Sequence, residues 1–170
     1  KVEFVNLKAN YILYGQIKDQ VDAFIAGFDS LIPHKYLRIF TPAELDLLIC
    51  GVPTIDVNDF IENITFIEPY NANTHVVKLF FDVIKNWGNE DLAKLLLFMT
   101  GSSRVPLNGF KEFAEITNER LKIGPGGIRE NLPQAHTCFN ELDLPEYQTK
   151  EELENKLCKA MEYSNSFGIA

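Results

Sequence analysis

The stretch Leu121–Leu142, LKIGPGGIRENLPQAHTCFNEL, contains the clearest strand signals in this 170-residue chain. Residues 121–123 alternate apolar and polar side chains, and residues 137–142 alternate again. Glycine and proline residues bound both runs, which is typical of short strands separated by loops. The sequence therefore predicts a small sheet in the last third of the chain.

Helical patterns dominate the rest. Apolar residues recur at three- and four-residue steps over residues 8–28, 41–50, 74–84, 89–100 and 150–161. Capping boxes open the second and last of these helices, at Thr41 and Thr149. The buried side of the second helix is expected to comprise Leu45, Leu48 and Ile49, and the polar residues 164–166 are expected to release the chain from the last helix. We predict an α+β fold in two parts, a mostly helical N-terminal fragment followed by a small mixed α/β lobe.

The composition of the chain argues against several classes of function. The chain is 46% hydrophobic, which is enough for a core, and it carries 24 acidic against 16 basic residues, a net charge of −8. Such a surface repels phosphate backbones, so we expect no nucleic-acid partner. Because no apolar run reaches the roughly 18 residues of a membrane helix, we expect no membrane span. Neither end of the sequence shows a signal peptide or a lipidation motif.

The cysteine pattern favours a reducing compartment. Cys50, Cys138 and Cys158 are too few and too widely spaced for a disulfide framework or a zinc site. We therefore expect cytoplasmic or nuclear localisation, without metal or cofactor. Cys50 and Cys158, near helix ends among leucines, are expected to pack in the core.

Cys138 is the candidate nucleophile, because a thiolate is the strongest side-chain nucleophile near neutral pH. The alternative is a small buried hydrophobe, which free cysteines often are. A Cys–His hydrolase with His136 is less favoured, since two such residues on one strand lie roughly 6.5–7 Å apart, beyond a hydrogen bond. His136 can instead orient the loop.

Four ordered blocks resemble the HECT-type ubiquitin ligase domain. Residues 132–140, LPQAHTCFN, with LDLPEY at 142–147, resemble its active-site motif. Residues 100–110, 44–60 and 156–168 resemble three further blocks, so the resemblance spans nearly the whole chain. Phe60 departs from the usual tryptophan and Phe81 from a common Phe-Trp pair, both as aromatic replacements.

The resemblance implies a ubiquitin transferase. Cys138 would accept ubiquitin from a ubiquitin-conjugating enzyme as a thioester and pass it to a lysine of a protein substrate. His136 and Thr137 would shape the loop, and Phe139 would anchor the strand below the thiol. Asn140 would hydrogen-bond nearby backbone. Phe167 would belong to a C-terminal tail used in transfer.

The resemblance also implies a division into lobes. Residues 1–51 would be the last helices of an N-terminal lobe and residues 59–170 a complete C-terminal, catalytic lobe. A hinge at 52–58 would join them, with its flexible residues at Gly51, Val52, Pro53, Thr54, Ile55 and Asp56. The surface that docks the conjugating enzyme would lie mostly outside this chain, so we expect the chain alone to load poorly from that enzyme. The alternative is a non-catalytic ubiquitin-binding or scaffold fragment of the same fold.

Overall fold

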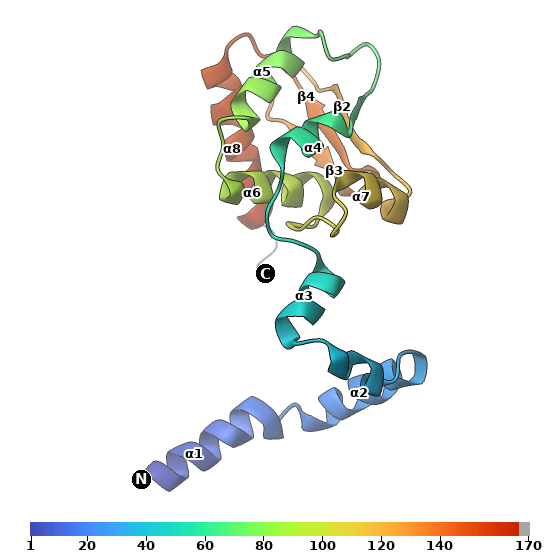
Figure 1. The fold of residues 1–170 in the computed structure, drawn as a ribbon. Coiled ribbons are helices and arrows are strands. Elements are labelled where there is room, and N and C mark those ends of the chain that lie inside the picture. The colour runs from blue at the N-terminus through green and yellow to red at the C-terminus, as the bar shows by residue number, and fades with distance from the viewer. Residues whose placement is uncertain (167–170) are drawn as a thin grey trace. The chain divides into compact units, whose positions relative to one another are not determined.

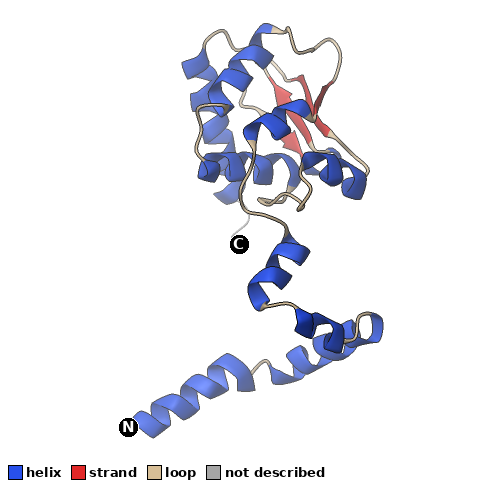
Figure 2. Ribbon diagram, in the orientation of Figure 1, coloured by secondary structure: helices blue, strands red, loops and turns tan. Residues whose placement is uncertain are grey.

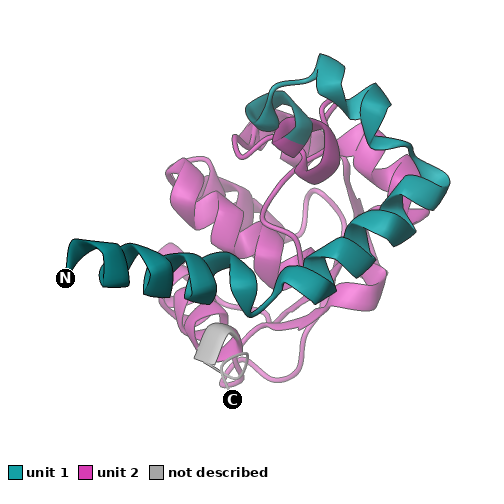
Figure 3. Cartoon of the chain, turned by 90° about the horizontal axis from the view of Figure 1, so that it is seen from below, with its two compact units in different colours: residues 1–45 teal, residues 46–170 magenta. Residues whose placement is uncertain are grey.

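The computed structural model describes residues 1–166, and residues 165 and 166 only by their backbone. Phe167 lies outside the described residues. The chain divides into two compact units, residues 1–45 and 46–170, coloured separately in Figure 3. Together they contain many helices and one small sheet, which confirms the predicted α+β fold (Figure 2). The assignment of residues 52–58 as a hinge stays a prediction.

The first unit is helical throughout. It comprises α1 (Val2–Asn10), a π-helical segment (Tyr11–Gly15), α2 (Lys18–Leu31), a 3-10 helix (His34–Ile39) and the start of α3 (Pro42–Cys50). The predicted single helix over residues 8–28 is wrong, because the α-helical pattern is interrupted between Tyr11 and Ile17. Ile17 leaves the helical region at φ −112°, ψ 4°, and Gly15 is a poor helix former.

Helix α3 forms where the sequence predicts it, but its apolar side is not buried. Thr41 and Glu44 make the predicted capping box, since the Glu44 amide donates to Thr41 Oγ1 at 3.3 Å and the Thr41 amide donates to Glu44 Oε2 at 2.7 Å. Leu48 and Ile49 are exposed, contrary to expectation. A helical period identifies an apolar face, but burial also requires a surface that covers it.

The second unit is built on a four-stranded sheet (Figure 1). Its strands are β1 (Ile64–Phe66), β2 (Leu121–Pro125), β3 (Gln134–His136) and β4 (Glu141–Leu144). The spatial order is β1-β2-β4-β3, with β1, β2 and β4 parallel and β3 antiparallel to β4. The strand predicted at 121–123 is confirmed. The strand predicted at 137–142 is wrong at its start, because residues 137–139 form a 3-10 turn.

Five helices accompany the sheet: α4 (Val57–Glu62), α5 (His75–Ile84), α6 (Asn89–Thr100), α7 (Phe110–Thr117) and α8 (Lys150–Ser166). Helices α5, α6 and α8 confirm three predictions, and Gly101 ends α6 in the left-handed conformation at φ 80°. The sequence did not predict α4 and α7, which are too short to show a clear period. Helix α8 continues through Ser166, so the expected release at residues 164–166 is wrong.

The core lies where α8 packs against α5 and α6, and where α6 packs against the sheet. Its fully buried members include Phe80, Leu95, Leu142 and Leu153. Phe60 is buried and meets the Phe110 ring edge-on at 5.1 Å, so phenylalanine fills this position. The core therefore supports β4, the strand that follows the candidate cysteine.

Two of the other predictions concern cysteines. Cys158 is half-buried and packs against the core, as predicted, and burial raises the pKa of its thiol. Cys50 is exposed, so its predicted core packing is wrong. Cys50 is the last residue of α3, the helix on which Leu48 and Ile49 are also exposed.

The predicted hinge residues contact the rest of the second unit. Val52 pairs with Val105 through two backbone hydrogen bonds of 2.8 and 3.1 Å. Ile55 is buried, and its amide donates to Asn89 Oδ1 at 2.8 Å. The Asp56 side chain caps α4 by accepting from the Asn58 amide at 2.8 Å. These contacts fix the course of residues 52–56 over the second unit.

Candidate active site

Cys138 lies on the 3-10 turn Thr137–Phe139, between β3 and β4, and it is exposed. Strand β3 is at the edge of the sheet, and helix α6 packs against both β3 and the turn that follows it. Because Cys138 is exposed, the alternative in which it is a small buried hydrophobe is wrong. An exposed thiol on a short turn can be reached by the end of another polypeptide.

Asn140, the residue that follows the turn, fixes the position of the turn through hydrogen bonds. It is only 4% exposed and has left-handed backbone angles, φ 51° and ψ 41°, which asparagine tolerates better than most residues. Its side-chain amide donates to the Glu119 carbonyl at 3.2 Å and to Thr117 Oγ1 at 3.3 Å. Its own carbonyl accepts from the Lys122 amide at 2.9 Å. The predicted hydrogen bond from Asn140 to nearby backbone is confirmed.

The other two turn residues point to solvent. Phe139 is 56% exposed, so its predicted role as an anchor under the thiol is wrong. The prediction assumed a strand at this point, and a 3-10 turn does not alternate its side chains inward and outward as a strand does. Thr137 is exposed as well, and its carbonyl faces the Asn140 amide at 3.5 Å. The hydrogen bonds of Asn140 and the packing of α6 hold the turn, whereas the Phe139 ring is largely exposed.

A row of charged side chains crosses the sheet beside the turn. In the register of the strands, His136 stands opposite Glu141, and Glu141 stands opposite Lys122. His136 Nε2 lies 3.2 Å from Asp143 Oδ2. Burial raises the pKa of Glu141, and the neighbouring Asp143 raises it further. Within the described residues no hydrogen bond joins His136 to Cys138.

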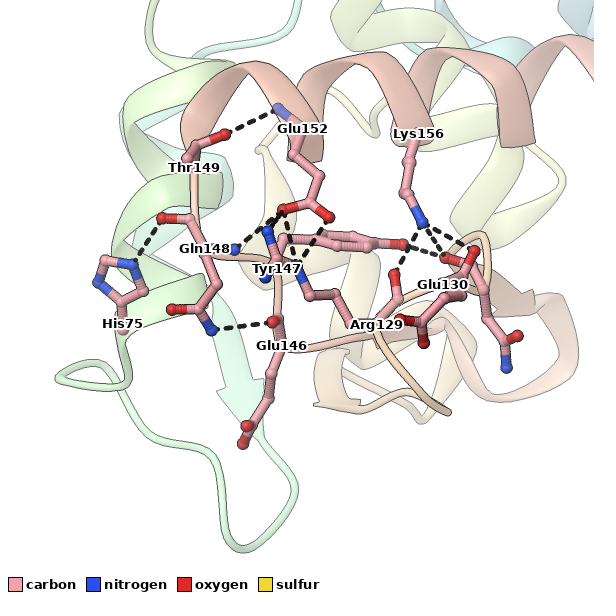
Figure 4. Close-up of polar contacts among 10 residues, drawn as sticks. His75, Arg129, Glu130, Glu146, Tyr147, Gln148, Thr149, Glu152 and Lys156 are labelled. Atoms are coloured by element: carbon pink, nitrogen blue, oxygen red, sulfur yellow. Dashed lines mark hydrogen bonds and ion pairs between the residues drawn. The ribbon is translucent and has the colours of Figure 1, made fainter.

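The loop that precedes β3 is held to α8 by an ion pair and hydrogen bonds, as Figure 4 shows. The Arg129 guanidinium forms a bidentate ion pair with the Glu152 carboxylate, with Nε 2.9 Å from Oε1 and Nη2 2.7 Å from Oε2. The Glu152 amide in turn donates to Thr149 Oγ1 at 3.2 Å, which supports the predicted start of this helix. The Arg129 contact holds the pKa of the Glu152 carboxyl below its ordinary value.

Lys156 completes this attachment one helical turn later (Figure 4). Its ammonium donates to the carbonyls of Arg129 and Glu130, each at 2.7 Å, and lies 5.2 Å from the centre of the Tyr147 ring. The Tyr147 hydroxyl donates to the Asn131 carbonyl at 2.7 Å, and burial raises the pKa of that hydroxyl. Sequence analysis missed these contacts. The spacing of Glu152 and Lys156, four residues apart on one helix face, was the available signal.

The ion pair predicts a pH dependence of stability. In the folded chain the pKa of Glu152 is lowered. The ion pair therefore adds to the free energy of unfolding above the pKa that Glu152 has in the unfolded chain. This stabilisation is lost as pH falls through the pKa that Glu152 has in the folded chain. We expect Glu152→Gln to lower the urea midpoint at pH 7, and the difference from the unmodified chain to shrink progressively below about pH 4.5. Glu151→Gln is the control, since Glu151 is exposed on the same turn and its carboxylate makes no hydrogen bond or ion pair among the described residues. A pH-independent difference would contradict the assignment.

Two kinds of feature are not found among the described residues, a membrane-spanning helix and a metal-binding cluster. None of the described helices is long and apolar enough to cross a bilayer. The residues that the structure describes contain no group of three or more histidine, cysteine or acidic side chains placed to hold a metal ion.

Fold and site together define a small α/β lobe that presents a cysteine thiol on a surface turn at a sheet edge. The model of the HECT-domain (ubiquitin-transferase) family matches residues 1–170, and the chain belongs to this family. It is 46% identical over 173 residues to the E3 ubiquitin-protein ligase UPL1 of Arabidopsis thaliana. The matched region comprises the whole chain and 5% of the length of UPL1. The chain is 40% identical over 168 residues to Nedd-4 of Drosophila melanogaster and to NEDD4 of Homo sapiens, each covering 98% of the chain.

The chain spans only a small part of these relatives, 17% of Nedd-4 and 13% of NEDD4. All three relatives carry the description E3 ubiquitin-protein ligase. The resemblance on the four sequence blocks is thereby confirmed as family membership.

Proposed function

We propose that this chain transfers ubiquitin through a thioester on Cys138. The observation that carries the proposal is the exposed thiol of Cys138 within the family's active-site motif. The Cys138 thiolate would attack the thioester carbonyl that joins ubiquitin to a conjugating enzyme. One carbon–sulfur bond forms and one breaks, so the exchange is nearly isoenergetic and needs an accessible thiolate and an oriented partner.

In the second half-reaction a lysine amine of the protein substrate takes the ubiquitin as an isopeptide. The partners of the proposed reaction are thus ubiquitin, a conjugating enzyme and a protein substrate, in the cytoplasm or the nucleus. The hinge predicted at residues 52–58 would let the lobe move between the two half-reactions, which requires the contacts of Val52 with Val105 and of Ile55 with Asn89 to open. The role of Phe167 in transfer stays a prediction, since this residue lies outside the described part of the chain.

The experiment loads the chain directly, without a conjugating enzyme. Incubation with a ubiquitin whose C-terminus carries a vinyl sulfone is expected to give one covalent adduct, and peptide mapping is expected to place it on Cys138. An adduct on Cys50, which is also exposed, or no adduct at all would overturn the proposal.

Two alternatives give other results in the same experiment. A non-catalytic ubiquitin-binding module would retain ubiquitin without forming the adduct. A Cys–His hydrolase would release ubiquitin from a small C-terminal ester with many turnovers. The hydrolase has little support, because His136 and Cys138 share no hydrogen bond among the described residues and a working dyad needs close contact or one bridging water.

A further inference from the structure

We propose that Asp143 is a positioning residue for the transfer to lysine. It fixes the ring of His136 so that the free ring nitrogen can take the proton of the attacking amine. This inference rests on the proposed function and concerns only its second half-reaction. Asp143 lies on β4, five residues after Cys138, and sequence analysis assigned it no role.

The antiparallel pairing of β3 with β4 brings the two side chains together. His136 stands opposite Glu141, and Gln134 stands opposite Asp143, so His136 and Asp143 are diagonal neighbours on one face of the sheet. Leu142 and Leu144, which alternate with the two acidic residues, point to the core and are fully buried. The outward face of this strand pair is therefore polar, and it ends at the turn that carries Cys138.

The contact of 3.2 Å between His136 Nε2 and Asp143 Oδ2 sets the proton position on the ring. An ionised carboxylate can only accept a hydrogen bond, so the proton must be on Nε2. In the neutral ring, Nδ1 then carries a lone pair and can act as the base. Without the carboxylate the ring would exchange between tautomers and orientations.

The chemical step needs such a base after the amine has attacked. The neutral lysine nitrogen attacks the thioester carbonyl, a carbon–nitrogen bond forms, and the bond from carbon to Cys138 Sγ breaks. The sulfur keeps the electron pair as a thiolate, and the excess proton on nitrogen passes to His136 Nδ1. The thiolate needs no proton from His136 to leave, in agreement with the absence of a hydrogen bond between them in the described structure.

The other charged groups on this face distinguish Asp143 from a general acidic surface. Glu141 lies between His136 and Lys122 in the strand register, and no hydrogen bond joins it to His136 in the described structure. Lys122 forms an ion pair with Glu119. Of the two carboxylates of β4, only that of Asp143 makes a hydrogen bond or ion pair with His136 among the described residues, and Glu141 in turn interacts with Asp143.

The test separates transfer from loading. The chain is loaded on Cys138 from a ubiquitin thioester of a small thiol, and discharge is then followed in a single turnover with free lysine. We expect Asp143→Ala to slow the discharge to lysine about tenfold or more, a part of what a general base contributes. The loading rate is expected to stay within twofold of the unmodified chain.

Hydroxylamine serves as the second acceptor, because the nitrogen that carries the excess proton after its attack is much more acidic than that of the lysine adduct and can lose the proton to water without a base. If Asp143 acts through the base, Asp143→Ala leaves the discharge to hydroxylamine unchanged. Equal slowing with both acceptors would show that the variant has disturbed the turn, and would overturn the inference. Failure of the unmodified chain to load would instead overturn the proposed function.

Glu141→Gln is the matched control, because Glu141 has no hydrogen bond to His136 among the described residues and glutamine keeps a side-chain amide beside Asp143. We expect its discharge to lysine to remain within about twofold. Nitrogen NMR of His136 gives an independent readout, with a predominant Nε2–H tautomer in the unmodified chain and in Glu141→Gln, and a mixture in Asp143→Ala. A loss in Glu141→Gln as large as in Asp143→Ala, or an unchanged tautomer in Asp143→Ala, would contradict the inference.

Discussion

Replacing Cys138 with serine is expected to remove the reductant-sensitive ubiquitin adduct, with loading slower by roughly 10³-fold or more, as when other catalytic nucleophiles are removed. Near neutral pH a fraction of an exposed cysteine is thiolate, whereas a serine hydroxyl without an adjacent base is un-ionised and a poor nucleophile. Any residual adduct of the variant would be an oxyester, which reductant does not cleave. The measurement is non-reducing gel electrophoresis after incubation with a ubiquitin thioester of a small thiol.

Cys50 provides the matched control for this experiment, because its thiol is exposed as well. Cys50→Ser is expected to load at the rate of the unmodified chain. Cys158→Ser should behave in the same way, since the Cys158 thiol is half-buried and its pKa is raised by burial. A comparable loss in either control, or full loading of Cys138→Ser, would show that the acceptor is another residue.

A second comparison tests the expectation about the conjugating enzyme. The chain is expected to load efficiently from the small-molecule thioester and poorly from a charged conjugating enzyme, because the docking surface would lie mostly outside residues 1–170. Fast, reductant-sensitive loading from the conjugating enzyme would contradict this expectation without affecting the role of Cys138.

Sequence patterns predicted the elements whose signals are local. Helices α5, α6 and α8 have long apolar periods, and Gly101 and the capping residue Thr149 mark two of their ends where the sequence placed them. Helix α4 has six residues and is set by distant contacts: Asp59 accepts from the Phe110 amide at 2.9 Å and so links α4 to the first turn of α7. No local period contains that information.

In the candidate site, too, some features could be predicted from the local sequence and others could not. The exposure of the Cys138 thiol and the hydrogen bonding of Asn140 to nearby backbone agree with what the motif predicted. The exposure of Phe139 did not, because one left-handed residue at Asn140 converts an apparent strand into a turn followed by a shorter strand. The contact between His136 and Asp143 depends on the register of β3 against β4, which the sequence alone does not fix.

Asn140→Ala is expected to destabilise the chain by about 3–4 kcal/mol. The left-handed conformation costs a residue other than glycine, asparagine or aspartate about 1–2 kcal/mol. The loss of the two buried hydrogen bonds to Glu119 and Thr117 costs about 1 kcal/mol each. The change is measured by urea unfolding followed by circular dichroism, with an unchanged slope of the free energy against urea concentration.

Asn140→Gly separates the two contributions, because glycine accepts the left-handed backbone but has no amide. We expect it to be more stable than Asn140→Ala by about 1–2 kcal/mol, the cost of the backbone conformation. Since this residue holds the turn below Cys138, both variants should also load ubiquitin more slowly, and Asn140→Ala more so. If the glycine variant were no more stable than the alanine variant, the left-handed backbone would not be what selects asparagine here, and the position of the thiol would depend on the buried amide alone.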